Sequence, residues 1–92
     1  MTGSRYEVAW TPTARRTLNH VPEKVATAAI EFVYGPLVSN PHRVGRELRL
    51  DLSGVWSARR GDYRVLYRID EKRRRVEVIV IEHRRDVYRR RT

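Results

Sequence analysis

Two β-patterned runs, residues 63–69 and 75–81, are separated only by the charged segment 70–74. Runs rich in β-branched and aromatic residues this close together predict two strands joined as an antiparallel hairpin. The second run is β-branched on both faces, which favours a position inside a sheet. This hairpin is the feature around which the rest of the chain must fold.

Three further strands are expected before the hairpin. Residues 6–10 alternate with one apolar face, and leucines alternate with charged residues over 47–52. Ser53-Gly54 turns the chain into a strand over 55–59, and Gly61-Asp62 turns it again into the hairpin.

Two helices are expected between the first and second strands. Thr11-Pro12 combines a capping residue with a proline at the first helical position. The first helix has an apolar stripe of Ala14, Leu18 and Val21, and the second helix has apolar residues at spacings of three and four over 25–37. Gly35-Pro36 should end or kink this second helix, and residues 40–42 are expected to be loop.

Helices followed by antiparallel hairpins predict an α+β fold. We expect two N-terminal helices on one face of a four- to five-stranded, mainly antiparallel sheet, with a short C-terminal helical turn over 86–91. The chain of 92 residues is sufficient for one compact domain, residues 1–92.

The charge of the chain favours a nucleic-acid partner. Lys and Arg number 20 against 11 Asp and Glu, a net charge of +9, and only Lys24 and Lys72 are lysine. Arginine grips phosphate through a planar fork and stacks on bases. The alternative is a chain that uses arginine as its ordinary surface cation, but the arginines cluster in the second half.

Several other classes of protein are disfavoured. Cysteine is absent, so disulfides, thiol nucleophiles and thiolate zinc sites are excluded. The N-terminus lacks the apolar segment of a signal peptide, and the longest apolar run, 78–81, is too short to span a bilayer. We therefore expect a soluble cytoplasmic protein without a membrane partner.

Arg64 is the first candidate for chemistry, because it interrupts a strand pattern and arginine is rarely buried without a partner. It either forms a cross-strand ion pair with Glu77 or Asp51, or holds a guanidinium rigidly for the charge that develops on a scissile phosphate.

Tyr88 and His83 are the candidates for proton transfer. Tyr88 follows Arg84 by four residues, and neighbouring arginines would lower its pKa; the alternative is an aromatic packed on the sheet edge. His83 follows the last strand and titrates near neutral pH, although a histidine there is commonly a surface residue.

A basic track is expected across the sheet. Its members are Arg43, Arg46, Arg49, Arg59 and Arg60. Glu47 and Glu82 are weaker candidates for a general base and serve more naturally as partners for arginines. His20 and His42 lack companions at ligand spacing, so no metal site and no cofactor are expected. The chemistry that stays open to these residues is metal-free cleavage of RNA. In this reaction the 2′-hydroxyl of the RNA itself serves as the nucleophile.

Two segments carry a resemblance to a known family: residues 52–67, Leu-Ser-Gly-Val-Trp-Ser-Ala-Arg-Arg-Gly-Asp-Tyr-Arg-Val-Leu-Tyr, and residues 83–88, His-Arg-Arg-Asp-Val-Tyr. With the helical region around Pro22, they resemble the RelE branch of the RelE/ParE toxin superfamily over nearly the whole chain. The resemblance implies an endoribonuclease that cuts mRNA in the ribosomal A site. It also implies a neighbouring antitoxin that silences the toxin and through which the complex binds operator DNA.

The resemblance also implies roles for individual residues. Arg64 matches the arginine that stabilises the phosphate, Arg84 the arginine near the leaving group, and Tyr88 the tyrosine that stacks on or deprotonates the nucleotide. Arg59 matches the second of two lysines, and Ser57 stands where the first is expected. The further residues expected to bind substrate are Arg46, Arg49, Ser57, Arg60 and Arg85.

Serine cannot replace a lysine as a cation or an efficient base at neutral pH. Either Arg59 and Arg60 compensate, or His83 or Glu47 takes the role of the base. Two other functions stay open: a non-enzymatic inhibitor of DNA gyrase, as in the ParE branch, and a degenerate toxin that acts only as a binding module.

Overall fold

The computed structural model of the protein describes residues 5–48 and 54–83. Its elements, in chain order, are β1 (Glu7–Trp10), α1 (Pro12–His20), α2 (Glu23–Phe32), the π-helical turn η2 (Val33–Leu37), α3 (Pro41–Val44), β2 (Arg46–Glu47), β3 (Trp56–Arg60), β4 (Tyr63–Asp70) and β5 (Arg75–His83).

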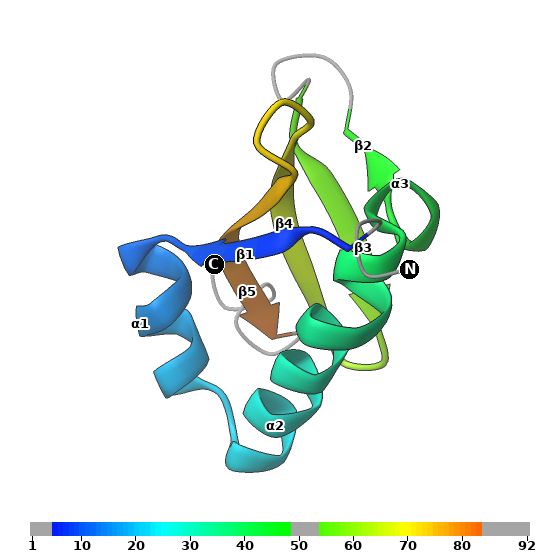
Figure 1. The fold of residues 1–92 in the computed structure, drawn as a ribbon. Coiled ribbons are helices and arrows are strands. Elements are labelled where there is room, and N and C mark those ends of the chain that lie inside the picture. Colours follow the sequence, from blue (N-terminus) through cyan, green and yellow to red (C-terminus); the bar gives the residue numbers. More distant parts are fainter. Residues whose placement is uncertain (1–4, 49–53, 84–92) are drawn as a thin grey trace.

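The strands form one five-stranded sheet in the order β1-β5-β4-β3-β2 (Figure 1). β1 is parallel to β5, and the other three pairings are antiparallel. The predicted α+β fold is confirmed, as is the interior position of the last strand, because β5 pairs with β1 on one side and β4 on the other.

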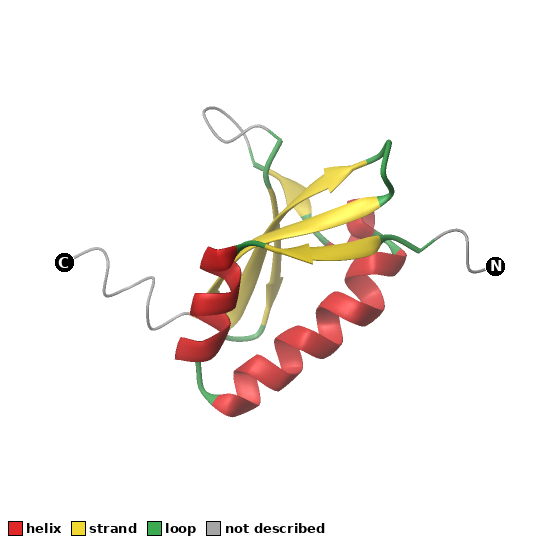
Figure 2. Cartoon of the chain, turned by 60° about the vertical axis from the view of Figure 1, so that its left-hand side comes forward, coloured by secondary structure: helices red, strands yellow, loops and turns green. Residues whose placement is uncertain are grey.

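Both long helices contribute to a single core. Apolar side chains of α1, α2 and η2, among them Ala14, Phe32 and Leu37, pack with Val65 and Val78 from the sheet. Val65 and Val78 lie on the same face of the sheet, so both helices cover that face, as Figure 2 shows. The other face carries no described helix and is called the open face below.

α1 also protects the edge of β5 beyond the point where β1 ends. Thr11 caps α1 by accepting a hydrogen bond from the backbone N–H of Ala14, and its hydroxyl donates to the carbonyl of Ile79 at 2.7 Å. The backbone N–H of Ile81 donates to the Thr17 hydroxyl at 3.0 Å. Thr11, which caps α1, and Thr17 within it therefore satisfy backbone groups that a sixth strand would otherwise pair with.

A β-bulge in β5 changes which side chains reach the open face. Leu66 pairs with Val80 while Tyr67 pairs with Val78, so Ile79 is an extra residue without a partner in β4. The side chains alternate along a strand, and one extra residue exchanges the two faces beyond it. Glu82 consequently lies opposite Arg64 on the open face instead of pointing into the core.

The second helix continues through Gly35-Pro36 instead of ending there. α2 runs directly into η2, which contains Pro36. Proline has no N–H and its ring crowds the preceding turn, and a widened π turn accommodates both effects. The predicted end of the helix at Gly35-Pro36 is therefore wrong, and the structure has a wider turn there.

The prediction of a loop at residues 40–42 is wrong, because α3 begins at Pro41 with Asn40 at its N-cap position. Tyr67, which is fully buried, anchors this helix: its hydroxyl donates a hydrogen bond of 2.6 Å to the carbonyl of Pro41. One buried hydrogen bond thus ties the short helix to the centre of the sheet.

Burial raises the pKa of Tyr67, and to a lesser degree it raises the pKa of Tyr63. The folded protein holds these phenolic protons more tightly than the unfolded chain does. Stability should therefore be complete below about pH 10, where a free tyrosine titrates, and fall above it by up to about 1.4 kcal/mol per pH unit for each tyrosine.

Urea denaturation between pH 8 and pH 11 measures this loss. Tyr67→Phe should lower the unfolding free energy at pH 8 by about 1–3 kcal/mol, because the carbonyl of Pro41 loses its donor. The same variant should show a shallower fall above pH 10, and an unchanged slope would contradict the assignment.

Some sequence predictions concern residues outside the described ranges. β2 begins one residue earlier than expected, at Arg46, and residues 49–53 are not described, so the rest of the strand over 47–52 stays a prediction. The C-terminal helical turn over 86–91 also lies outside them. In the part of the chain that the structure describes, no helix is long and apolar enough to cross a membrane.

Candidate nucleic-acid interface

Strand alternation assigns the candidate residues to the two faces of the sheet. Tyr63, Val65 and Tyr67 of β4 are buried under the helices, so the residues between them face the other way. The side chains on the open face, read from the strand register, are Glu7, Ala9, Arg46, Ser57, Arg59, Arg64, Leu66, Arg68, Asp70, Arg75, Glu77, Val80 and Glu82.

Arg64 forms an ion pair across β4 and β5, as the first interpretation of this residue anticipated, but the partner is different. Its Nε donates to Oε1 of Glu82 at 2.7 Å, where Glu77 or Asp51 was expected. Glu77 lies opposite Arg68 instead, and Asp51 is outside the described residues. The Arg64 side chain is 38% exposed and that of Glu82 only 10%. A nearly buried carboxylate therefore fixes a guanidinium that still reaches solvent.

Arg59 lies directly opposite Arg64 on the neighbouring strand β3. Side chains paired in this way have Cβ atoms about 4.5–5.5 Å apart, and like charges there repel each other. Glu82 offsets part of the charge of Arg64, but no described carboxylate forms an ion pair with Arg59. This strand pair therefore presents a cationic position suited to an anion.

A hollow of about 510 Å³ lies next to Arg59, between α3, β2 and β3. Its lining residues are Arg43, Val44, Gly45, Arg46, Ser57 and Arg59. The three arginines come from three different elements, and Ser57 pairs directly with Arg46. No acidic side chain lines this hollow, so the charged groups of its lining are all positive.

Close packing at Gly45 makes this arrangement possible. A Cβ at that position would lie 2.7 Å from the carbonyl oxygen of Ser57 and closer still to the Tyr67 hydroxyl. Only glycine lets the segment between α3 and β2 approach β3 so closely. The backbone that carries Arg43 and Arg46 thereby lies close to β3, which carries Arg59.

Two predicted site residues lie on the helix-covered side of the sheet. His83 pairs with Tyr63, which is buried there. The guanidinium of Arg60 sits over the ring of Phe32 from α2, with Cζ 4.6 Å from the ring centroid. Strand alternation thus separates His83 and Arg60 from Arg64, and their parts in binding or catalysis stay predictions.

Glu47 has a structural contact that the sequence did not reveal. Its Oε2 accepts a hydrogen bond of 2.8 Å from the backbone N–H of Gly54, and its strand partner is Trp56, away from the open face. The remaining predicted site residues lie outside the described residues and are Arg49, Arg84, Arg85 and Tyr88.

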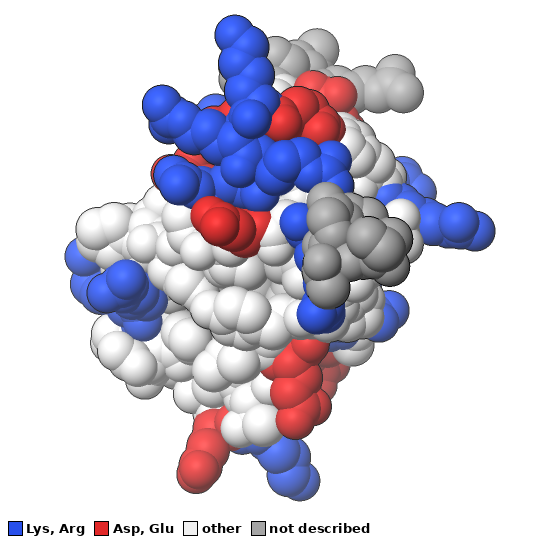
Figure 3. All heavy atoms as spheres, viewed as in Figure 1, with Lys and Arg blue, Asp and Glu red and all other residues white. Residues whose placement is uncertain are grey.

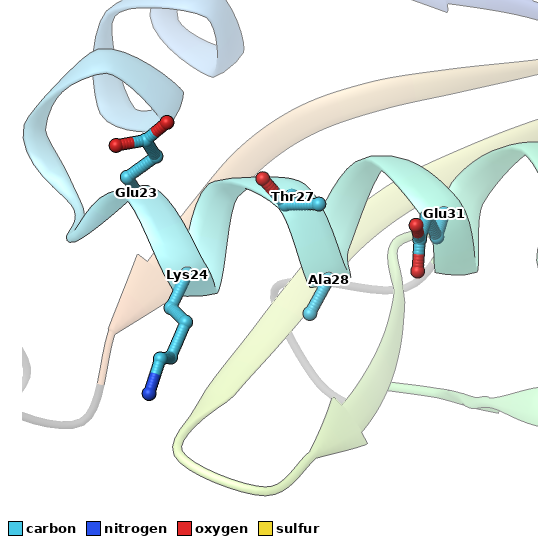
Figure 4. Close-up of a pocket in the computed structure, with 5 residues that line it drawn as sticks. All are labelled: Glu23, Lys24, Thr27, Ala28 and Glu31. Atoms are coloured by element: carbon cyan, nitrogen blue, oxygen red, sulfur yellow. The ribbon is translucent and has the colours of Figure 1, made fainter.

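Other features of the surface offer less chemistry. A hollow of about 560 Å³ on α2 is lined by residues of that helix alone: Glu23, Lys24, Thr27, Ala28 and Glu31 (Figure 4). Another, at the β4–β5 turn, mixes acidic and basic side chains. In the view of Figure 3, Lys and Arg side chains lie over that turn, and the centre of the visible surface is largely uncharged. Within the described residues no group of His, Asp and Glu could hold a metal ion.

The family of this chain follows from comparison with known proteins. Residues 8–88 match the family described as the ParE toxin of the type II toxin–antitoxin system parDE. The chain belongs to this toxin family. The resemblance to the RelE/ParE superfamily that the sequence suggested is confirmed.

Two curated relatives indicate the RelE branch of the superfamily. Toxin RelE of Mycobacterium tuberculosis is 58% identical over 84 residues, which cover 91% of this chain and 87% of the relative. Toxin RelG of the same organism is 48% identical over 85 residues, covering 92% and 98% of the two chains.

The fold agrees with a solved structure from the same branch. The Mycobacterium tuberculosis toxin–antitoxin complex RelBE2 contains a chain that is 46% identical, with a TM-score of 0.85. The match covers 87% of this chain and 99% of that one. This RelE-type chain therefore retains the fold over almost the full length of its relative.

Sequence reasoning missed how α3 completes the cationic hollow. The sequence predicts Arg43 only as a member of a basic track, after a loop over residues 40–42. The signal was present in Asn40-Pro41, a capping residue followed by proline, which is the pattern that correctly located α1 at Thr11-Pro12. The closeness of Gly45 to β3 had no such signal, because it depends on long-range packing.

Proposed function

We propose that this chain is a metal-independent endoribonuclease that cuts mRNA held in the ribosomal A site and so inhibits translation. The observation that carries this function is the pair of arginines, Arg59 and Arg64, that lie opposite each other on the open face of the sheet. Membership in a type II toxin family supports the same function, as do relatives named RelE and RelG.

The reaction divides the phosphodiester by internal attack. The 2′-oxygen of the upstream ribose loses its proton and bonds to phosphorus, and the bond from phosphorus to the 5′-oxygen of the next nucleotide breaks. That oxygen gains a proton, so the products are a 2′,3′-cyclic phosphate and a 5′-hydroxyl. Arg64 and Arg59 stabilise the negative charge that grows on the phosphorane.

The remaining roles follow the family pattern. Arg84 acts near the leaving oxygen, and Tyr88 stacks on or deprotonates the nucleotide. His83 and Glu47, the alternative bases, are directed away from Arg64. A site with weak bases gains most from a substrate that is already held in line, which is the contribution we assign to the ribosome.

We assign a cognate antitoxin as the protein partner, as in the RelBE2 complex. The antitoxin would silence the toxin and connect the complex to operator DNA, and the toxin would act in the cytoplasm where translation occurs.

Mapping of the 5′ ends of cellular mRNA after induction tests this function. Expression without the neighbouring antitoxin gene should stop growth and produce new 5′-hydroxyl ends within codons of translated messages. Co-expression of the antitoxin should restore growth. Blocking translation initiation beforehand should remove the cuts, because the substrate would no longer be positioned.

Two other outcomes would replace this function. Intact messages together with gyrase-dependent DNA breaks would establish a ParE-like inhibitor. Normal growth with intact RNA, and retained binding of the antitoxin, would establish a degenerate toxin that serves as a binding module.

A further inference from the structure

The hollow beside Ser57 has the composition of an anion site that is separate from Arg64. Arg43, Arg46 and Arg59 line it, and none of them forms an ion pair with a described residue. Three guanidinium groups around one hollow repel each other unless a negative charge enters. The hydroxyl of Ser57 adds a neutral hydrogen-bonding group to the same lining.

Arg64 and the hollow beside Ser57 occupy different positions on the open face. Its Nε is bound to Glu82 of β5, on the side of β4 away from the hollow. The hollow extends from β3, the neighbour of β4, to β2, which lies two strands or roughly 10 Å from β4 at the usual strand spacing. Arg59 lies between them and borders both. The open face therefore offers two anion positions arranged across the strands.

Packing beneath the hollow fixes the backbone that carries its cations. The hydrogen bond from Tyr67 to the carbonyl of Pro41 anchors α3, and the close approach at Gly45 presses the following segment against β3. The backbone positions of Arg43, Arg46 and Arg59 are therefore set before a ligand arrives, while all three residues are exposed to solvent and can reach it.

We infer that this hollow binds a second phosphate of single-stranded RNA, adjacent to the phosphate that is cleaved at Arg64. The RNA backbone then crosses the strands from β4 toward β2. The assignment rests on the proposed ribonuclease function, and it adds that the substrate must carry two consecutive phosphodiesters at the site.

The donors around the hollow favour a nucleotide over a single carboxylate from an acidic protein. Three guanidinium groups and the Ser57 hydroxyl supply more donors than one carboxylate can accept. A nucleotide adds ribose and base acceptors to the two non-bridging oxygens of its phosphate, and its base can stack on a guanidinium plane. A nucleotide with its phosphate therefore matches these donors better.

The inference is tested by a thermodynamic cycle that combines the removal of a charge from the RNA with the removal of an arginine from the protein. The ligands are 2′-O-methyl trinucleotides, which cannot be cleaved, with both linkages charged or with either one replaced by a neutral methylphosphonate. Binding to the free protein is followed by NMR titration at low salt, with the wild type, Arg43→Ala, Arg46→Ala and Arg64→Ala. Arg15→Ala on α1 is the matched control, because it removes the same charge from an exposed site on another element.

In the wild type, neutralising either linkage should weaken binding about tenfold, the scale of one charge-assisted contact. Arg43→Ala and Arg46→Ala should make one linkage insensitive to neutralisation, and Arg64→Ala should make the other insensitive. Each arginine lost should also flatten the salt dependence of log K by about 0.7. Arg15→Ala should leave both linkages sensitive.

Two results would overturn the second phosphate site. One is an equal loss of affinity for all three trinucleotides in Arg43→Ala, which would indicate only a long-range field. The other is an unchanged trinucleotide affinity together with lost binding of a hexaglutamate peptide, which would assign the hollow to an acidic protein partner. A failure of the nuclease function would give a different result. Cellular RNA would stay intact, while the thermodynamic cycle would still identify two phosphate positions.

Discussion

Arg64→Ala should reduce RNA cleavage by about 10²–10³-fold, the loss typical of removing one preorganised donor from a developing oxyanion. Arg64 is held by Glu82 at 2.7 Å and lies opposite Arg59, so its guanidinium is positioned before substrate arrives. The readout is the rate of cleavage of ribosome-bound mRNA with purified toxin, supported by survival of cells that express the variant. Arg64→Lys should recover part of the rate, because it keeps the charge but loses the planar fork.

The matched control is Arg68→Ala. Arg68 is on the same strand and the same face, four residues further along and opposite Glu77. Its loss removes the same charge without touching the proposed site, so cleavage should remain close to that of the wild type. Equal losses in the two variants would mean that net charge, and not the position of Arg64, supports cleavage.

A second control separates catalysis from folding. Arg64→Ala removes a partner from Glu82, whose side chain is only 10% exposed, and should lower the unfolding free energy by about 1–2 kcal/mol. Adding Glu82→Gln removes the charge that has lost this partner and should recover part of that stability. The double variant should remain inactive, and a return of cleavage would show that Arg64 acts only through Glu82.

Gly45→Ala should lower the unfolding free energy by about 2–3 kcal/mol, at the upper end of the cost of overpacking. The new Cβ would lie 2.7 Å from the carbonyl oxygen of Ser57, which belongs to the backbone of β3 and cannot rotate away. It would also collide with the Tyr67 hydroxyl, which anchors α3. Urea denaturation measures the cost, and the trinucleotide titration should show weaker binding because Arg43 and Arg46 move away from Arg59.

Gly35→Ala provides the comparison for this prediction. Gly35 lies in the π-helical turn, and a Cβ there meets no atom within 4 Å. Alanine has a higher helix propensity than glycine, so this variant should be neutral or slightly stabilising. If both alanine variants were equally stable, the close approach at Gly45 would not be a constraint on the fold.

The described site residues also explain why we expect only slow RNA cleavage in the absence of the ribosome. The Glu82 carboxylate pairs with Arg64, and Glu47 accepts a backbone hydrogen bond from Gly54. Cations that stabilise the transition state are better supplied than groups that remove the proton. We therefore expect purified toxin without ribosomes to cut RNA slowly, with positioning by the ribosome supplying the missing rate.

Local sequence signals determined most of the architecture. Thr11-Pro12 located α1, the apolar spacing over 25–37 located α2, and the two β-patterned runs located the hairpin. These signals succeed because capping, helical periodicity and strand alternation each depend on residues close together in the chain. Arg64 was recognised in the same way, as a charge inside a strand pattern, and the family motifs around it were also local.

Tertiary structure alone decided how the candidate residues are combined. The bulge at Ile79 brings Glu82 to the face of Arg64, whereas alternation without it would have turned that carboxylate into the core. The close approach of Gly45 to β3 places Arg43 and Arg59 around the same hollow. Strand alternation places His83 and Arg60 on the helix-covered side of the sheet. Sequence sets the period of each strand, but the register between strands and the packing beneath them depend on contacts between residues far apart in the chain.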